Sequence, residues 1–181
     1  MLAAQLLASD ALEGQPLQRT TTAKTDGVYL RVGSDCSGMC SEILALELLL
    51  TPNTKMAHCF ASDREAWIRS FIRLFFPDVG TIYGDMHERP TADMPHVHIY
   101  HAGFPCTPFS RNGNMDGVAD SNGHAFFPVY RYIAQVLPSS FILENVSTLP
   151  TEFPDTFVFM VNMIQQIMEG NRVTYDIHFQ I

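Results

Sequence analysis

The residue best suited to chemistry is Cys106, which follows a proline near the end of the stretch HVHIYHAGFPCTPFSRNG at residues 96–113. Alternating apolar residues at the start of this stretch predict a strand that ends in a Gly-Phe-Pro turn. A thiol at such a strand end can act as a nucleophile when backbone N–H groups or a cation such as Arg111 favour the thiolate. The alternative is a small buried hydrophobic residue. Pro105 and Pro108 make the turn rigid, which favours the nucleophile.

Three acidic residues also stand at the ends of apolar stretches. Glu144 directly follows SFIL at 140–143, a position that favours a chemical role over a capping or ion-paired one. Asp63 comes after a predicted strand, at about the 20-residue spacing from a glycine turn at which an acid accepts from ribose hydroxyls, although it is equally suited to cap a helix. Asp85 follows Gly84 and by itself is an ordinary turn residue.

Strands and helices alternate along the chain, which predicts a Rossmann-like, doubly wound and mostly parallel α/β sheet. The predicted strands are 28–33, 56–61, 79–83, 96–102, 140–143 and 173–181. The predicted helices are 41–50, 63–76, 124–137 and 153–169, the last with Gly170 at its C′ position. Trp67 belongs to a wide apolar stripe and is expected in the core. In such sheets ligands bind at the carboxyl ends of the strands, where the candidate residues fall.

Four short motifs together resemble those of the cytosine-5 DNA methyltransferases. PCTPFS at 105–110 resembles the family's P-C-x-x-F-S nucleophile motif, and SG at 37–38, GD at 84–85 and ENV at 144–146 follow the family's order. The resemblance covers roughly residues 28–181. It implies a class I S-adenosylmethionine-dependent methyltransferase fold, represented by its N-terminal catalytic portion and truncated after about six strands.

The resemblance also implies roles for individual residues. Cys106 and Glu144 are the catalytic pair it implies. The residues it implies for binding S-adenosyl-L-methionine are Asp35, Cys36, Ser37, Gly38, Asp63, Asp85, Met86, Pro105 and Asn145. Those it implies for contacts with the substrate are Ser110, Arg111, Asn145 and Val146.

The implied reaction is methylation of a cytosine flipped out of DNA. Cys106 adds to C6 while Glu144 hydrogen-bonds to or protonates N3, so that C5 can take a methyl group from S-adenosylmethionine. Relatives with the same Pro-Cys pair act on tRNA, so RNA is the second candidate substrate. A non-catalytic cofactor-binding or interaction domain is a third interpretation, because Met39-Cys40-Ser41 stands where the family continues with x-Gly-Gly.

Chain length, composition and net charge limit the number of domains and the kind of surface that the chain can present. The 181 residues are 46% hydrophobic and fit one domain at 27–181 behind a mobile N-terminal leader at 1–26. The net charge of −8 is the wrong sign for a surface that grips phosphates, so a basic recognition surface and the family's Gln-x-Arg-x-Arg motif are expected in a longer chain.

The cysteine and histidine pattern predicts neither disulfides nor a metal site. Four cysteines without a secretory signal indicate a reducing, intracellular compartment: the nucleus in a eukaryote or the cytoplasm in a prokaryote. No apolar stretch reaches the ~20 residues that span a membrane. No C-x-x-C pair accompanies the histidines, so we expect no bound metal.

Overall fold

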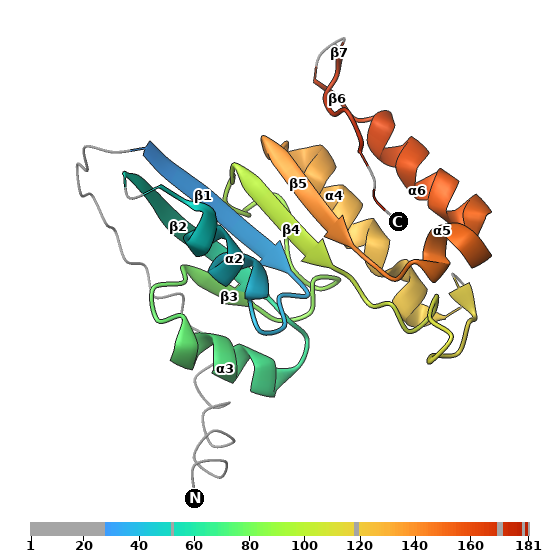
Figure 1. The fold of residues 1–181 in the computed structure, drawn as a ribbon, viewed down its shortest axis with the longest axis horizontal. Helices are drawn as coiled ribbons and strands as arrows, with labels where there is room; N and C mark the ends of the chain where they lie inside the picture. The colour runs from blue at the N-terminus through green and yellow to red at the C-terminus, as the bar shows by residue number, and fades with distance from the viewer. Residues whose placement is uncertain (1–27, 52, 118–119, 170–171, 179, 181) are drawn as a thin grey trace, which may run out of the picture.

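The computed structural model describes residues 28–51, 53–117, 120–169, 172–178 and 180, so the predicted leader and Gly170 lie outside the described residues. Its centre is a parallel five-stranded sheet in the order β3-β2-β1-β4-β5 (Figure 1). The strands are β1 (Val28–Asp35), β2 (Thr54–Ser62), β3 (Thr81–Tyr83), β4 (Ile99–Gly103) and β5 (Ser140–Glu144). The predicted doubly wound fold is therefore confirmed, and the strand order changes direction between β1 and β4.

Helices cover both faces of this sheet. Helices α2 (Ser41–Leu49) and α3 (Ala66–Phe75) pack on one face, where Ile43, Ile68 and Ile72 join one core cluster. Helices α4 (Phe126–Val136) and α6 (Pro154–Gln165) pack on the other, and the 3-10 helix η3 (Ser121–Ala125) leads into α4. Figure 1 shows α2 in front of β1 and β2, and α4 behind β5. Parallel strands need this double cover because neither of their faces can meet water.

One glycine sets the fit between the central strands. A Cβ atom on Gly33 would lie 2.1 Å from the Phe60 ring, so only glycine lets that ring pack over β1. The β1–β2 register shifts at the same point, between Val32 and Gly33. Phe60 is fully buried and stacks at a tilt against Tyr132 of α4, with ring centroids 5.3 Å apart. The glycine thus brings the acid-bearing ends of β1 and β2 close to α4.

The structure corrects three predicted elements. The prediction of a sixth strand in the main sheet is wrong. Among the described residues of 173–181, only Val173 lies in a strand, β7 (Arg172–Val173), and β7 pairs with β6 (Met168–Glu169) outside the main sheet. The last helix, α6, starts at Pro154 and ends at Gln165, and a separate short helix, α5 (Thr148–Glu152), precedes it in the chain. The two helices are separated at Phe153 because the residue before a proline avoids helical geometry.

Trp67 is the third correction. Trp67 is 59% exposed and does not lie in the core, because α3 turns Ile68 and Ile72 toward the sheet and Trp67 away from it.

Among the described residues, no helix is long and apolar enough to cross a membrane.

Candidate active site

A cavity of about 270 Å³ opens at the carboxyl ends of β1 to β4. Five of the predicted cofactor-binding residues line it: Cys36, Asp63, Asp85, Met86 and Pro105. Three acids, Asp63, Glu65 and Asp85, face one arginine, Arg64, along the same wall. An acid-rich lining favours a ligand that carries positive charge.

Both aspartates in this lining keep acceptor capacity for a ligand. Asp63 Oδ2 accepts from the Gly38 amide at 3.1 Å and Oδ1 accepts from the Glu65 amide at 2.9 Å. Asp85 Oδ1 accepts from the His87 amide at 2.8 Å. A carboxylate offers about four acceptor sites, so these bonds orient the two groups without saturating them. Glu65, not Asp63, is the N-cap residue of α3.

The turn after β1 keeps a glycine-like shape although it contains few glycines. Cys36, Gly38 and Cys40 all have positive φ, at 50°, 51° and 53°. A left-handed conformation costs an L-residue roughly 1–2 kcal/mol, which the surrounding contacts must offset. The Ser37 amide donates to Ser62 O at 2.9 Å, and its hydroxyl accepts from the Ser62 amide at 2.9 Å.

Two of the predicted cofactor-binding residues, Ser37 and Gly38, use their backbone amides within the protein. The Ser37 and Gly38 amides already donate to the end of β2, and neither residue lines the cavity, so the turn shapes the wall from behind. Cys36 does line it, and burial, with help from Asp35 and Asp63, raises the pKa of its thiol to about 12.

Asp35 is a core residue whose side-chain partners lie within the protein. Its side chain is fully buried, and it pairs with both terminal nitrogens of Arg89. The Ser62 hydroxyl donates to it as well, and the Tyr100 hydroxyl donates at 2.5 Å. These donors surround both of its oxygens and Asp35 does not line the cavity, so a contact between Asp35 and the cofactor stays a prediction.

Arg89 is held by aromatic rings as well as by charge. Its guanidinium carbon lies 5.5 Å from the Phe60 ring centroid, 5.6 Å from that of Tyr83 and 5.8 Å from that of Tyr132. Burial alone would lower the pKa of Arg89, but the Asp35 carboxylate raises it above the usual value. No sequence pattern predicts this pair, because its members are 54 residues apart.

The predicted catalytic pair lies at the carboxyl ends of two neighbouring strands, Glu144 as the last residue of β5 and Cys106 in the turn after β4. Glu144 is opposite Gly103 in the β4–β5 register, and its Oε2 lies 3.3 Å from where a Cβ on Gly103 would be. Cys106 follows Gly103 by three residues and is half-buried. Asn145 Nδ2 donates to Phe104 O at 3.1 Å, which fastens the end of β5 to the cysteine turn. Asn145 does not line the cavity, so its contacts support a positioning role.

The buried ring of Phe109 anchors the loop that carries Cys106 to the rest of the protein. Phe109 is fully buried and packs edge-on against Phe153 with centroids 5.5 Å apart, while Thr148 Oγ1 donates to Phe109 O at 2.5 Å. A Cβ on Gly113 would lie 1.9 Å from Thr107 O, so the loop closes on itself only with glycine there.

The four predicted substrate residues lie along this loop and at the end of β5. Arg111 is exposed and pairs with Glu152 of α5. Ser110 Oγ accepts from the Asn112 amide at 3.2 Å, and the Val146 amide donates to Asn145 Oδ1 at 2.9 Å. Arg111 and Ser110 thus have partners within the protein, and a substrate contact remains a prediction for both.

Sequence reasoning missed one contact of the cavity wall. Arg64 Nη1 donates to Asn122 Oδ1 at 2.7 Å, and both residues line the cavity. Arg64 directly follows the predicted ligand Asp63, but nothing in the sequence pairs it with a residue 58 positions later.

The sheet order, the helices on both faces and the cavity at the strand ends define a Rossmann-like methyltransferase fold. A crystal structure of a Spodoptera frugiperda DNMT2 mutant matches it with a TM-score of 0.50 at 17% identity, over 75% of this chain and 41% of that one. The sequence profile of the C-5 cytosine-specific DNA methylases matches residues 38–181. The chain belongs to the C-5 cytosine-specific DNA methylase family.

Curated relatives agree with this family. The chain is 45% identical over 92 residues to the Type II methyltransferase M.NlaIV of Neisseria lactamica, covering 51% of this chain and 22% of that protein. It is 32% identical over 123 residues to the Type II methyltransferase M.NgoBI of Neisseria gonorrhoeae, covering 67% of this chain and 36% of that protein. The chain thus spans only about a quarter to a third of the length of these relatives.

Proposed function

We propose that this chain carries the catalytic half of a DNA cytosine-5 methyltransferase. The observation that carries the proposal is that Glu144 ends β5 opposite Gly103, the last residue of β4, while Cys106 follows Gly103 by three residues, beside a cavity lined by Gly103 and Pro105. Because neighbouring strands lie about 4.8 Å apart, a nucleophile just past one strand and an acid at the end of the next can address two parts of one flat ring. Family membership supports DNA as the substrate.

In the proposed reaction the Cys106 thiolate adds to C6 of a flipped cytosine. Glu144 donates a hydrogen bond or a proton to N3, which stabilises the charge that addition pushes into the ring. Once C5 carries the methyl group, loss of the C5 proton to a base or to solvent lets the C6–sulfur bond break and releases the thiolate. Asn145 holds the cysteine turn through Phe104, so the thiol stays in place during both steps.

The cavity suits S-adenosyl-L-methionine as the cofactor. When bound, this cofactor supplies the electrophilic methyl group that C5 accepts. Its sulfonium and ammonium charges match a lining with three acids and one arginine. Asp63 would accept from the ribose hydroxyls and Asp85 from the adenine amine, with Cys36, Met86 and Pro105 as walls.

Calorimetry tests the cofactor site without any turnover. S-adenosylmethionine should bind the chain, and Asp63→Ala and Asp85→Ala should each weaken binding by about tenfold or more, since a lost hydrogen bond to a charged group is worth ~1.5–3 kcal/mol. Asp78→Ala is the matched control, because Asp78 is exposed and lies outside the cavity. Unchanged affinity in both cavity variants would reject the site.

Covalent trapping tests the reaction. Fluorine at C5 leaves no proton to remove, so a 5-fluorocytosine duplex should stay bonded to Cys106 in the presence of cofactor. Cys106→Ser should form no adduct, while Cys59→Ser should trap normally. An adduct with tRNA but not DNA would overturn the DNA assignment. If the chain binds the cofactor but forms no adduct, it is a non-catalytic binding module, and the proposed catalytic role is overturned.

A further inference from the structure

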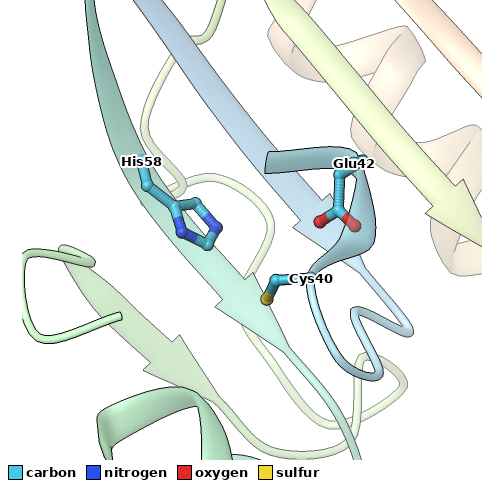
Figure 2. Close-up of side chains that lie close together, drawn as sticks. All are labelled: Cys40, Glu42 and His58. Atoms are coloured by element: carbon cyan, nitrogen blue, oxygen red, sulfur yellow. The ribbon is translucent and has the colours of Figure 1, made fainter. Parts of the chain in front are cut away.

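A second group of chemically capable side chains lies on the other side of the β1 turn from the cofactor cavity. Cys40 precedes α2, Glu42 stands in its first turn, and His58 lies in the middle of β2. One ligand atom from each lies within 4.8 Å of the other two. Figure 2 shows the three side chains converging on the space between the start of α2 and β2.

These side chains are buried without the partners that buried polar groups need. Cys40 is fully buried, and His58 is 9% exposed. In the part of the chain that the structure describes, both ring nitrogens of His58 and one carboxylate oxygen of Glu42 are buried and make no hydrogen bond of normal geometry. Leaving a buried polar atom unpaired costs about 1–3 kcal/mol, so a His58 nitrogen and a Glu42 oxygen left unpaired beside the Cys40 thiol point to a missing ligand.

We propose that Cys40, Glu42 and His58 bind a zinc ion. A thiolate, an imidazole and a carboxylate are the three donor types that zinc takes in proteins, and three protein ligands leave a fourth position for water. Ligand atoms around a tetrahedral zinc lie roughly 3.3–3.8 Å apart, so small side-chain rotations would close the site. The thiol proton passes to solvent as the zinc–sulfur bond forms.

The surroundings of the site match this assignment. Ile43 and Ile72 in the same core cluster provide an apolar shell that excludes competing ligands. The Phe76 ring meets the His58 ring edge-on at 6.2 Å and limits its rotation.

A zinc ion here would link the start of α2 to β2. Nearby, the turn that precedes α2 is joined to the end of β2 by the bond from Ser37 to Ser62 and to Asp63, just past β2, by the bond from Gly38. Zinc would therefore stiffen a turn that has Cys40 in a left-handed conformation. The inference goes beyond methyl transfer and does not depend on it, since it concerns a separate group of residues.

Cobalt titration of the untagged, metal-free chain tests the site. One equivalent of Co²⁺ should bind and give a thiolate-to-cobalt charge-transfer band together with the strong visible bands of tetrahedral cobalt. One equivalent of Zn²⁺ should abolish both. Binding without the thiolate band, as at the exposed His96, would overturn the proposal, and so would no binding at all.

Variants identify the ligands. Cys40→Ser should lose the thiolate band. His58→Gln should keep the band but weaken binding by more than the ~10–100-fold that loss of an outer-shell partner costs. Cys59→Ser is the matched control, because Cys59 is the next residue on β2 and packs into the opposite core cluster.

A third variant keeps the test valid if substitution of the buried residues Cys40 or His58 impairs folding. Glu42→Gln keeps the shape of a half-buried side chain and should bind at least about tenfold more weakly with an unchanged circular dichroism spectrum. A thiolate band that persists in Cys40→Ser, or an unchanged affinity in Glu42→Gln, would refute the assignment.

Discussion

Replacement of Asp35 by asparagine tests the buried network directly. Asp35→Asn keeps the shape of the side chain but removes the charge that pairs with Arg89, whose side chain is only 4% exposed. Breaking a buried ion pair on one side costs about 3–5 kcal/mol, because the remaining charge stays uncompensated. Asparagine can still accept from Ser62 through its one amide oxygen, and its amide nitrogen can donate to the Tyr100 hydroxyl oxygen. Three aromatic rings still face the guanidinium, so we expect a loss near the lower limit, about 3 kcal/mol.

Urea unfolding followed by circular dichroism measures this loss. With an m-value of about 2 kcal/mol/M, a loss of about 3 kcal/mol lowers the midpoint by about 1.5 M. A domain with the usual stability of about 5–15 kcal/mol stays folded in water after such a loss. Asp78→Asn is the control, because Asp78 is exposed and should change stability by no more than about 0.5 kcal/mol.

A double variant separates charge pairing from simple loss of packing. Asp35→Asn with Arg89→Met leaves no buried charge unpaired, so it should be more stable than the sum of the single variants by at least about 1 kcal/mol. Strictly additive losses, or a loss below about 1 kcal/mol in Asp35→Asn alone, would refute the description of Asp35 as half of a buried ion pair.

Three further predictions concern the site. Glu144→Gln cannot protonate N3 and should slow adduct formation with a 5-fluorocytosine duplex by about 10²–10⁴-fold, and a normal rate would remove Glu144 from the mechanism. Gly113→Ala should displace the nucleophile loop because its Cβ would meet Thr107 O, which limited proteolysis detects as faster cleavage than in Asn112→Ala. Cys36 should react very slowly with iodoacetamide at pH 8 and faster as the pH rises, because burial raises its pKa to about 12. Mass spectrometry measures the extent of labelling, and rapid labelling of Cys36 at a rate that does not depend on pH would contradict its burial.

Much of the fold could be predicted from the sequence because its signals are local. Apolar runs followed by Gly, Pro or Asp located the five strands of the main sheet, with boundaries off by up to three residues. A proline after a strand, and an acid after the next strand, placed Cys106 and Glu144 at the same edge of a parallel sheet. The β4–β5 register agrees with that placement.

Helix and strand ends were less predictable where a distant partner decides them. The sequence 173–181 alternates like a strand, yet Tyr175 is held by its hydroxyl bond to Pro138 O, at 2.6 Å, and its ring contact with Phe141. Trp67 lies in an apolar stripe, but the packing of α3 leaves it outside. Neither outcome follows from periodicity, which says that a face is apolar but not what covers it.

The sequence by itself determined the order of the elements, the nucleophile turn and the acids at the strand ends, since each depends on residues close together in the chain. Only the tertiary structure decided that Asp35 pairs with Arg89, and that Cys40 and Glu42 meet His58. In both cases the parallel sheet, in the order β3-β2-β1, brings together residues from separate segments. Side-chain burial then determines which polar groups find partners and which are left facing a common space.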